Sequence, residues 1–217
     1  MFFILVTSLL IAGATTKPEL TPQNNGNKIL FYLYGDKSGG RIGLFDSQNY
    51  SIELIAKFNQ LYAPFQVATT QNKIFAMGSI NKPSFEIFDL NTRQISQGPD
   101  PPEWHFGASM AYYKGKLYRL GGKDGKDPKT WKDTNRVDVL IDGKWQTGPA
   151  LPLPTFGAQA ITSDEVLYVI GSRENRKIYR LSHDEREWIE IGELPERRDN
   201  FAVASLNGKI YITGGFQ

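Results

Sequence analysis

The feature that most constrains this chain is a short apolar segment, closed by a glycine, that occurs five times. The closing glycines lie 43, 43, 50 and 43 residues apart, at Gly35, Gly78, Gly121, Gly171 and Gly214. Internal similarity at a period of about 20–50 residues is typical of solenoids, propellers and other repeat architectures. The chain is therefore expected to fold as a series of equivalent units that stack on their neighbours.

Each repeat contains four short segments with the character of β-strands. A stretch opened by an aromatic residue precedes the glycine-closed segment, and segments of alternating polarity, such as residues 85–90 (FEIFDL), follow it. Turn dipeptides such as Asn207-Gly208 and Asp142-Gly143 separate the segments, as in β-hairpins. Residues 28–217 show no sustained apolar period of about 3.6 residues, which an amphipathic helix would require. The sequence predicts an all-β fold.

A four-stranded unit of this period is typical of a β-propeller blade, which buries its faces against neighbouring blades. In the third repeat, residues 116–122 (KLYRLGG) are followed by residues 136–140 (RVDVL) and by Trp145. This order of a glycine doublet, a Tyr-Asp-like turn and a tryptophan resembles the kelch repeat, and residues 194–201 resemble the linker between kelch blades. The resemblance covers residues 28–217 and implies a kelch-type β-propeller.

The number of repeats implies an incomplete ring. Residues 17–27 are polar and contain two prolines, so the first repeat lacks a recognisable innermost strand, and the last repeat stops after its second strand. We expect four near-complete four-stranded blades plus a partial one, whereas complete kelch propellers have more blades. Open ends would leave apolar faces and strand edges unpaired, which favours oligomer formation.

The N-terminal residues have the pattern of a targeting signal. Residues 2–12 form an uncharged, mostly apolar run that ends at the small residues 12–14 (AGA), which is typical of a secretory signal peptide. No Lys or Arg precedes the run, and the alternative is a buried strand of the folded domain. We predict a signal peptide at residues 1–14, a polar linker at residues 15–27 and the kelch-repeat propeller at residues 28–217.

A signal peptide predicts that the protein is secreted, and the alternative is a cytoplasmic location if residues 1–14 are not such a signal. In a secreted chain, Asn49 is a candidate glycosylation site because it begins the sequon at residues 49–51 (NYS).

The composition excludes several kinds of site. The chain has no Cys, which rules out disulfides, thiolate metal sites and cysteine nucleophiles. The copper oxidases that use kelch-like propellers need a Cys crosslinked to Tyr, so that branch is excluded as well. The formal net charge is +2, without the basic excess of a nucleic-acid-binding domain. Phosphate-binding loops, dinucleotide fingerprints and nucleophile elbows do not occur. We expect no cofactor, metal, nucleic acid or membrane span.

The two histidines are not expected to form one site. His105 lies in the linker before an innermost strand, and His183 lies in the turn before an outermost strand. Because these loops differ in face or radius in a propeller, the imidazoles should not share a metal, and each is expected to be solvated. The acidic stretch at residues 184–187 is predicted to be a solvated hairpin turn.

The resemblance implies that partner proteins bind to loops gathered on one rim of the propeller. These loops are the linkers before the innermost strands and the connections after each closing glycine. Residues 123–135 carry the additional length of the longest repeat, and they include a tryptophan of the kind that anchors interfaces. The candidate partner-binding residues are Trp131, Lys129, Lys132, Trp104, His105, Arg197, Arg198 and Asn200.

Other aromatic residues are assigned to packing. Trp145 and Trp188 occupy equivalent positions in their repeats and are predicted to pack within the blades, and Phe106 aligns with the recurring core aromatics. For Trp131 two interpretations remain open, a partner-binding anchor or a side chain folded back onto its blade.

The predicted function is a non-catalytic scaffold that binds a partner protein through its rim loops. The alternative is a secreted sugar mutarotase or epimerase of the sialic-acid type, because some kelch propellers have this activity. Such an enzyme needs an acid and a base close to the central channel. The linkers before the innermost strands offer the candidates His105, Arg197, Arg198, Asp199 and Asn200.

Overall fold

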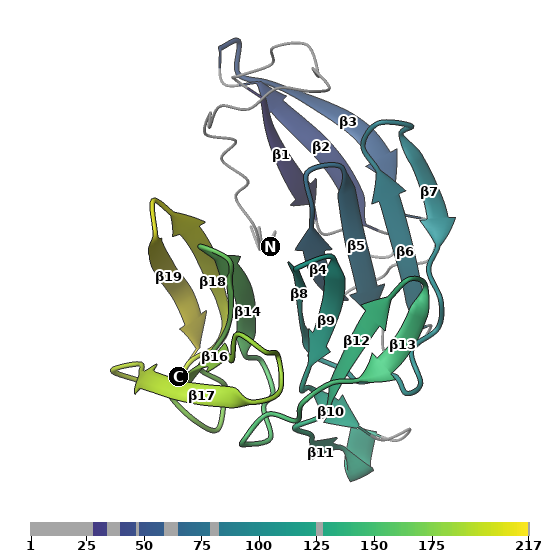
Figure 1. Ribbon diagram of the computed structural model, residues 1–217. Coiled ribbons are helices and arrows are strands. Elements are labelled where there is room, and N and C mark those ends of the chain that lie inside the picture. Colours follow the sequence, from purple (N-terminus) through teal and green to yellow (C-terminus); the bar gives the residue numbers. More distant parts are fainter. Residues whose placement is uncertain are drawn as a thin grey trace.

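The computed structural model describes residues 28–33, 40–46, 48–58, 65–78, 83–124 and 128–216, and its strands form six antiparallel sheets (Figure 1). Five of these sheets follow one another along the chain, contain one copy of the repeat each and are called blades, and the sixth is a small two-stranded hairpin. Blade 1 contains β1 (Lys28–Leu33), β2 (Arg41–Asp46) and β3 (Ser51–Lys57). Blade 2 contains β4 (Phe65–Thr69), β5 (Lys73–Gly78), β6 (Ser84–Asp89) and β7 (Gln94–Gln97).

The remaining blades follow the same strand order. Blade 3 contains β8 (Ser109–Tyr113), β9 (Lys116–Leu120), β12 (Val137–Ile141) and β13 (Lys144–Thr147). Blade 4 contains β14 (Gln159–Ser163), β15 (Val166–Ile170), β16 (Lys177–Leu181) and β17 (Trp188–Glu193). Blade 5 contains β18 (Asp199–Leu206) and β19 (Lys209–Phe216). The longest repeat adds a hairpin of β10 (Lys123–Asp124) and β11 (Lys132–Asp133), with the 3-10 helix η1 (Pro128–Thr130) between them.

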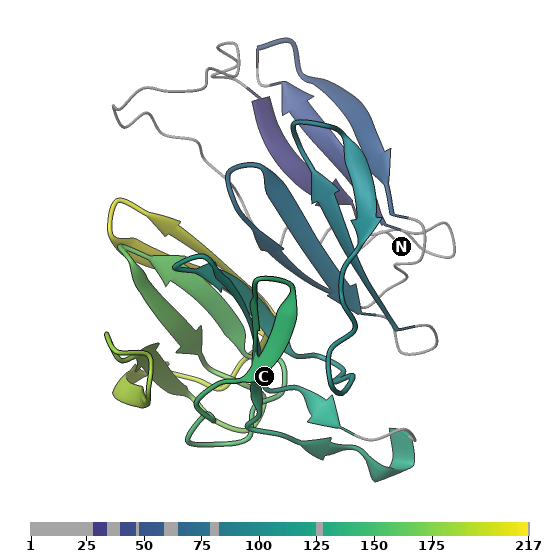
Figure 2. The same cartoon turned by 45° about the vertical axis from the view of Figure 1, so that its right-hand side comes forward.

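The innermost strands of successive blades lie side by side. Strand β8 contacts both β4 and β14, and β14 contacts β18. From these strands the blades fan outwards in an open arc, with blades 1 and 5 at its two ends (Figures 1 and 2). The described strands number three in blade 1, four in blades 2 to 4 and two in blade 5. The prediction of four near-complete blades plus a partial one is confirmed.

The hairpin turns follow from the residues that the sequence places in them. At Asn207-Gly208 the φ angles are 50° and 71°, and at Asp142-Gly143 they are 48° and 76°. Two successive positive φ values define the type I′ turn, whose twist matches that of the flanking strands. The turn between β14 and β15 reaches the same conformation without glycine, since φ is 46° at Asp164 and 59° at Glu165.

Each pair of neighbouring blades encloses its own hydrophobic core. The largest cluster lies between blades 3 and 4, where Tyr118 and Val139 pack with Leu167, Val169 and Trp188. Three smaller clusters lie between blades 1 and 2, blades 2 and 3, and blades 4 and 5. No single core spans the whole arc within the described ranges. Stability is therefore built up blade by blade, as in other stacked repeats.

In blades 3 and 4, a tryptophan on the outermost strand forms a hydrogen bond with the linker that enters the blade. The indole Nε1 of Trp145 donates to the carbonyl of Pro99 at 2.8 Å, and that of Trp188 donates to the carbonyl of Pro149 at 2.9 Å. Both rings also pack with the cores between blades. The predicted packing role of these equivalent tryptophans is confirmed.

Some strands begin later than the apolar pattern indicates. Strands β8 and β14 begin at Ser109 and Gln159, three residues after Phe106 and Phe156. Gly107 and Gly157 have φ angles of 66° and 71°, which interrupts the extended backbone between each aromatic residue and its strand. Phe106 and Phe156 consequently lie half-buried beside the loops instead of in the core.

Residues 1–27 lie outside the described ranges, so the predicted signal peptide and polar linker stay predictions. Asn49 is exposed in the turn between β2 and β3, and its side chain accepts a hydrogen bond from the Ser51 amide at 3.0 Å. In the part of the chain that is described, no helix has the length and apolar character needed to cross a bilayer.

Candidate functional site

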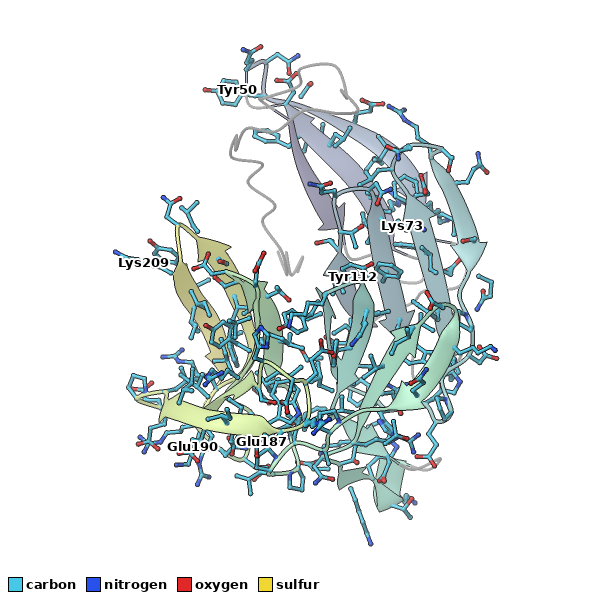
Figure 3. All side chains as sticks on the ribbon, in the orientation of Figure 1. Tyr50, Lys73, Tyr112, Glu187, Glu190 and Lys209 are labelled. Atoms are coloured by element: carbon cyan, nitrogen blue, oxygen red, sulfur yellow. The ribbon has the colours of Figure 1, made fainter. Side chains whose placement is uncertain are left out.

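The two predicted loop sets meet on one face of the arc, here called the rim. The linker before blade 3 pairs with β10 through reciprocal backbone hydrogen bonds between Phe106 and Lys123, at 2.9 and 2.7 Å. The linker before blade 4 is bonded in the same way, since the Gly122 amide donates to Thr155 at 2.6 Å and the Arg173 amide donates to Phe156 at 3.0 Å. In Figure 3, Tyr50 and Lys209 mark the opposite face, at the tips of blades 1 and 5. The rim loops are thus held by one another as well as by their own blades.

An aromatic cluster lies on the rim where β10 and β11 meet the linkers. The ring of Phe106 stacks on Trp131, with centroids 4.9 Å apart, and contacts Phe156 at 5.7 Å. The ammonium of Lys123 lies 4.5 Å from the centroid of the Phe156 ring, in cation–π geometry. The Trp131 indole thus stacks back on the linker of its own blade, but it is only half-buried, so its role as a partner-binding anchor stays a prediction. Lys129 and Lys132, which flank it, are exposed.

A buried group of charges lies beside this cluster, between blades 2 and 3. Arg119 on β9 and Asp138 on β12 form an ion pair at 2.9 Å, with side chains only 2% and 1% exposed. Arg136 Nε donates to the other oxygen of Asp138 at 2.7 Å. Burial lowers the pKa of Arg119 to about 10, while Asp138 opposes this shift, so the guanidinium stays charged at neutral pH. The sequence pattern alone did not predict this pair as part of a site.

His105 packs against this group of charges at the rim. Its side chain is 2% exposed, and its Nδ1 lies 3.0 Å from an Arg119 nitrogen. The expectation that His105 is solvated is therefore wrong, because the linker folds over the imidazole and places it against Arg119. Burial lowers the pKa of His105, and the positive charge of Arg119 lowers it further.

This environment predicts acid sensitivity. An unfolded histidine takes up a proton near pH 6.5, whereas folded His105 resists protonation. As the pH falls below about 6.5, the unfolded state binds more protons and the free energy of unfolding decreases. We expect the Tm of the wild-type protein to fall between pH 7.5 and pH 5.5, and the Tm of His105→Gln to fall less. Equal slopes of Tm against pH for the two proteins would exclude His105 as the source.

The other candidate residues lie in different parts of the structure. Trp104 is half-buried against the core between blades 2 and 3. Arg197 is exposed, while Arg198 donates to the carbonyl of Gly214 at 2.8 Å and pairs with Glu196 at 3.0 Å. These arginines and Asp199 belong to the edge of blade 5 and make no contact with His105 among the interactions described. The side chain of Asn200 lies outside the described part of the structure.

The predicted solvent exposure of the acidic turn between β16 and β17 is only partly correct. His183 and Glu187 are exposed, but Glu185 is only 18% exposed and accepts hydrogen bonds from Lys116 and Tyr118 of blade 3. Burial raises the pKa of Glu185, but these hydrogen bonds outweigh it and hold the pKa below its ordinary value. The prediction of a solvated turn is wrong for Glu185, because the turn packs against the neighbouring blade.

This contact predicts a stabilising link between blades 3 and 4 on the face opposite the rim. Glu185→Gln removes the charge but keeps an acceptor, and we expect it to lower the free energy of unfolding by about 1–2 kcal/mol, because charge-assisted hydrogen bonds are the stronger kind. Urea unfolding measures this change. The matched control Glu187→Gln, in the same turn but exposed, should change it by less than about 0.5 kcal/mol. Equal effects of the two substitutions would contradict the link.

The described side chains include no group of three or more His, Asp or Glu residues placed to hold a metal ion. The rim has groups that can form hydrogen bonds and groups that can stack on a ligand. It combines aromatic surface, exposed lysines and a buried histidine backed by paired charges.

Comparisons with known proteins agree with this architecture. No protein-family model matches the chain. Kelch-like protein 40 of Xenopus laevis is 25% identical over 166 residues, which cover 69% of this chain and 27% of that protein. N-acetylneuraminate epimerase of Pasteurella multocida is 43% identical over 63 residues, which cover 28% of this chain and 17% of that enzyme. The chain thus spans about a quarter or less of the length of these relatives.

A solved structure supports the fold directly. The structure of YjhT, a kelch propeller, superposes with a TM-score of 0.68 at 17% identity and covers 86% of this chain and 74% of that one. The repeated blades, the tryptophan contacts, the kelch-named relatives and this superposition lead to one conclusion. The chain is similar to kelch-repeat proteins and folds as part of a β-propeller.

Proposed function

We propose that the chain is a protein-binding scaffold that engages its partner through the rim near blade 3. The observation that carries this proposal is the mutual bonding of the linker and the longest loop, which fixes Phe106 and Trp131 in one cluster. Lys129 and Lys132 are exposed beside the cluster. Interface anchors are commonly aromatic, and loops on a rigid scaffold commonly carry the binding function. The kelch-named relatives support the same class of function.

The test compares the two faces of the molecule. A rim variant combines Trp131→Ala with Lys132→Ala, and a matched variant of the opposite face combines His183→Ala with Glu187→Ala. In a quantitative pull-down, the rim variant should lose about tenfold or more of a specific partner, because loss of a hot-spot residue costs about 1.4 kcal/mol or more. The opposite-face variant should retain it. Retention of every partner by a rim variant with a wild-type Tm would overturn the proposal.

A second function is supported by the match to the epimerase. We propose, as the alternative, that the chain is a sugar mutarotase or epimerase of the sialic-acid type, and His105 and Glu103 are the titratable pair at the rim that such chemistry would use. Their facing atoms, Nε2 and Oε2, lie 3.5 Å apart. Mutarotation of isotope-labelled N-acetylneuraminate by the purified protein tests this alternative. A rate equal to that of buffer would exclude it.

We further propose that residues 1–14 direct the chain into the secretory pathway. A mature protein beginning close to residue 15, found by N-terminal sequencing, would support this. A chain that keeps residues 1–14 in the mature protein would contradict it.

A further inference from the structure

We propose that the rim contains a carboxylate-binding site between His105 and Arg136, and that Glu103 of the same chain occupies this site in the free protein. This inference rests on the proposed function, because it assigns a specific contact to the rim. The ligand group is a carboxylate, supplied by an acidic side chain of a protein partner or by a small organic acid.

The contact with Arg119 fixes the protonation state of His105. The guanidinium of Arg119 has only N–H donors, so the Nδ1 atom that lies 3.0 Å from it must be an acceptor. In neutral His105 the proton is then on Nε2. Asp138 balances the charge of Arg119, and the backbone carbonyl of Glu103 accepts a second bond from Arg119 at 2.6 Å. Arg119 is therefore a positioning residue that fixes both the tautomer and the direction of the imidazole.

Within the part of the chain that the structure describes, this Nε2–H group has no hydrogen-bond partner. The side chain of His105 is 2% exposed, and Oε2 of Glu103 lies 3.5 Å from Nε2. A buried N–H group without an acceptor is costly, since each such group forfeits its interaction with water. An acceptor oxygen placed nearer to Nε2 would restore that bond.

Arg136 points at the same carboxylate oxygen. Its NH1 lies 3.2 Å from Oε2 of Glu103, while its Nε is held by Asp138 at 2.7 Å. The Nε2–H of His105 and the NH1 of Arg136 thus converge on one carboxylate oxygen. Arg119 and Asp138 hold these two donors in place before any ligand binds, which reduces the entropic cost of ordering the site.

Glu103 is the group that occupies this site in the free protein. The side chain of Glu103 is 60% exposed, so it lies at the surface and is readily displaced by another anion. With Glu103 turned away, Arg119 and Arg136 outnumber Asp138 by one charge, which favours an incoming anion. Glu103 therefore acts as a competing internal ligand that weakens the site in the free protein.

The experiment removes this competitor. Glu103→Ala is compared with wild type and with Glu196→Ala, a matched control that removes an equally charged, exposed rim carboxylate paired with Arg198. The probes are a capped tetraglutamate peptide and N-acetylneuraminate, titrated at pH 7.5 into the purified full chain. We expect Glu103→Ala to bind at least one probe about fivefold more tightly than wild type, and Glu196→Ala to stay within about twofold of wild type.

A second readout identifies the site itself. Binding to Glu103→Ala should shift the NMR resonance of the His105 Nε2–H group, and Arg136→Lys introduced into Glu103→Ala should weaken binding. A response to the peptide alone points to an acidic segment of a protein, and a response to the sugar acid alone points to a small acid; both support the site. Equal affinities of Glu103→Ala and Glu196→Ala for both probes, or an unmoved His105 resonance, would overturn it. If the rim variant of the partner pull-down still loses its partner in that case, the scaffold function stands without this site.

Discussion

Replacing Asp138 with alanine is expected to lower the free energy of unfolding by about 3–5 kcal/mol, measured by urea denaturation. The substitution leaves the guanidinium of Arg119 buried, since its side chain is 2% exposed, without the carboxylate that lies 2.9 Å away. Loss of one member of a buried ion pair is among the most destabilising single changes, because the remaining charge has neither water nor a partner.

Removing both charges together provides the control. In blade 4 the positions equivalent to Arg119 and Asp138 hold Val169 and Tyr179, which face each other across β15 and β16 and are buried. An apolar pair therefore fits this place in a blade. We expect Arg119→Met combined with Asp138→Val to recover more than half of the stability lost in Asp138→Ala. A cost below about 1 kcal/mol for Asp138→Ala would contradict the buried pair.

Gly121→Ala is expected to be almost as damaging, for a steric reason. Gly121 has a φ of 64°, and a Cβ atom there would lie 2.0 Å from Oγ1 and 2.6 Å from the backbone oxygen of Thr155. The linker before blade 4 must then move away from the rim. We expect a loss of about 3–4 kcal/mol, from about 1–2 kcal/mol for the left-handed backbone and a similar amount for the overlap.

Gly115→Ala is the matched control, because φ is 80° at this position and a Cβ atom would meet nothing within 4 Å. It should cost only about 1–2 kcal/mol, the backbone part of the effect. Urea midpoints of the two variants measure the difference. Equal midpoints would show that the linker does not pass as closely over Gly121 as described.

The sequence was sufficient to predict the blades but not their contacts. The glycine spacing predicts the strand order because strands of one blade are neighbours in the chain, and Asn207-Gly208 and Asp142-Gly143 predict their own turns. Contacts between blades depend on how the loops of one blade pack against the next blade, and the strand pattern does not specify this packing. For this reason the stacking of Trp131 on Phe106 could not be predicted from the sequence.

The charged part of the candidate site was the least predictable. Arg119 and Asp138 are separated by the loop of residues 121–136, and only the register of β9 against β12 brings them together. A signal was present, since each charge stands inside an otherwise apolar strand segment, LYRL or VDVL. His105 could not be distinguished from a solvated histidine, because its burial is produced by Arg119 and the fold of the linker. Glu185 was missed for the same reason, since Lys116 and Tyr118 belong to another blade.

We infer that a rigid rim, backed by the buried Asp138–Arg119 pair, directs His105 towards a ligand. Long-range proton–nitrogen NMR of the imidazoles tests it most directly, with His105→Gln used to assign the resonances. At pH 7.5 the account predicts that Nδ1 of His105 is unprotonated and that Nε2 carries the proton, with the signal from Nε2–H lost in His105→Gln. A proton on Nδ1, or an imidazolium at this pH, would contradict the account.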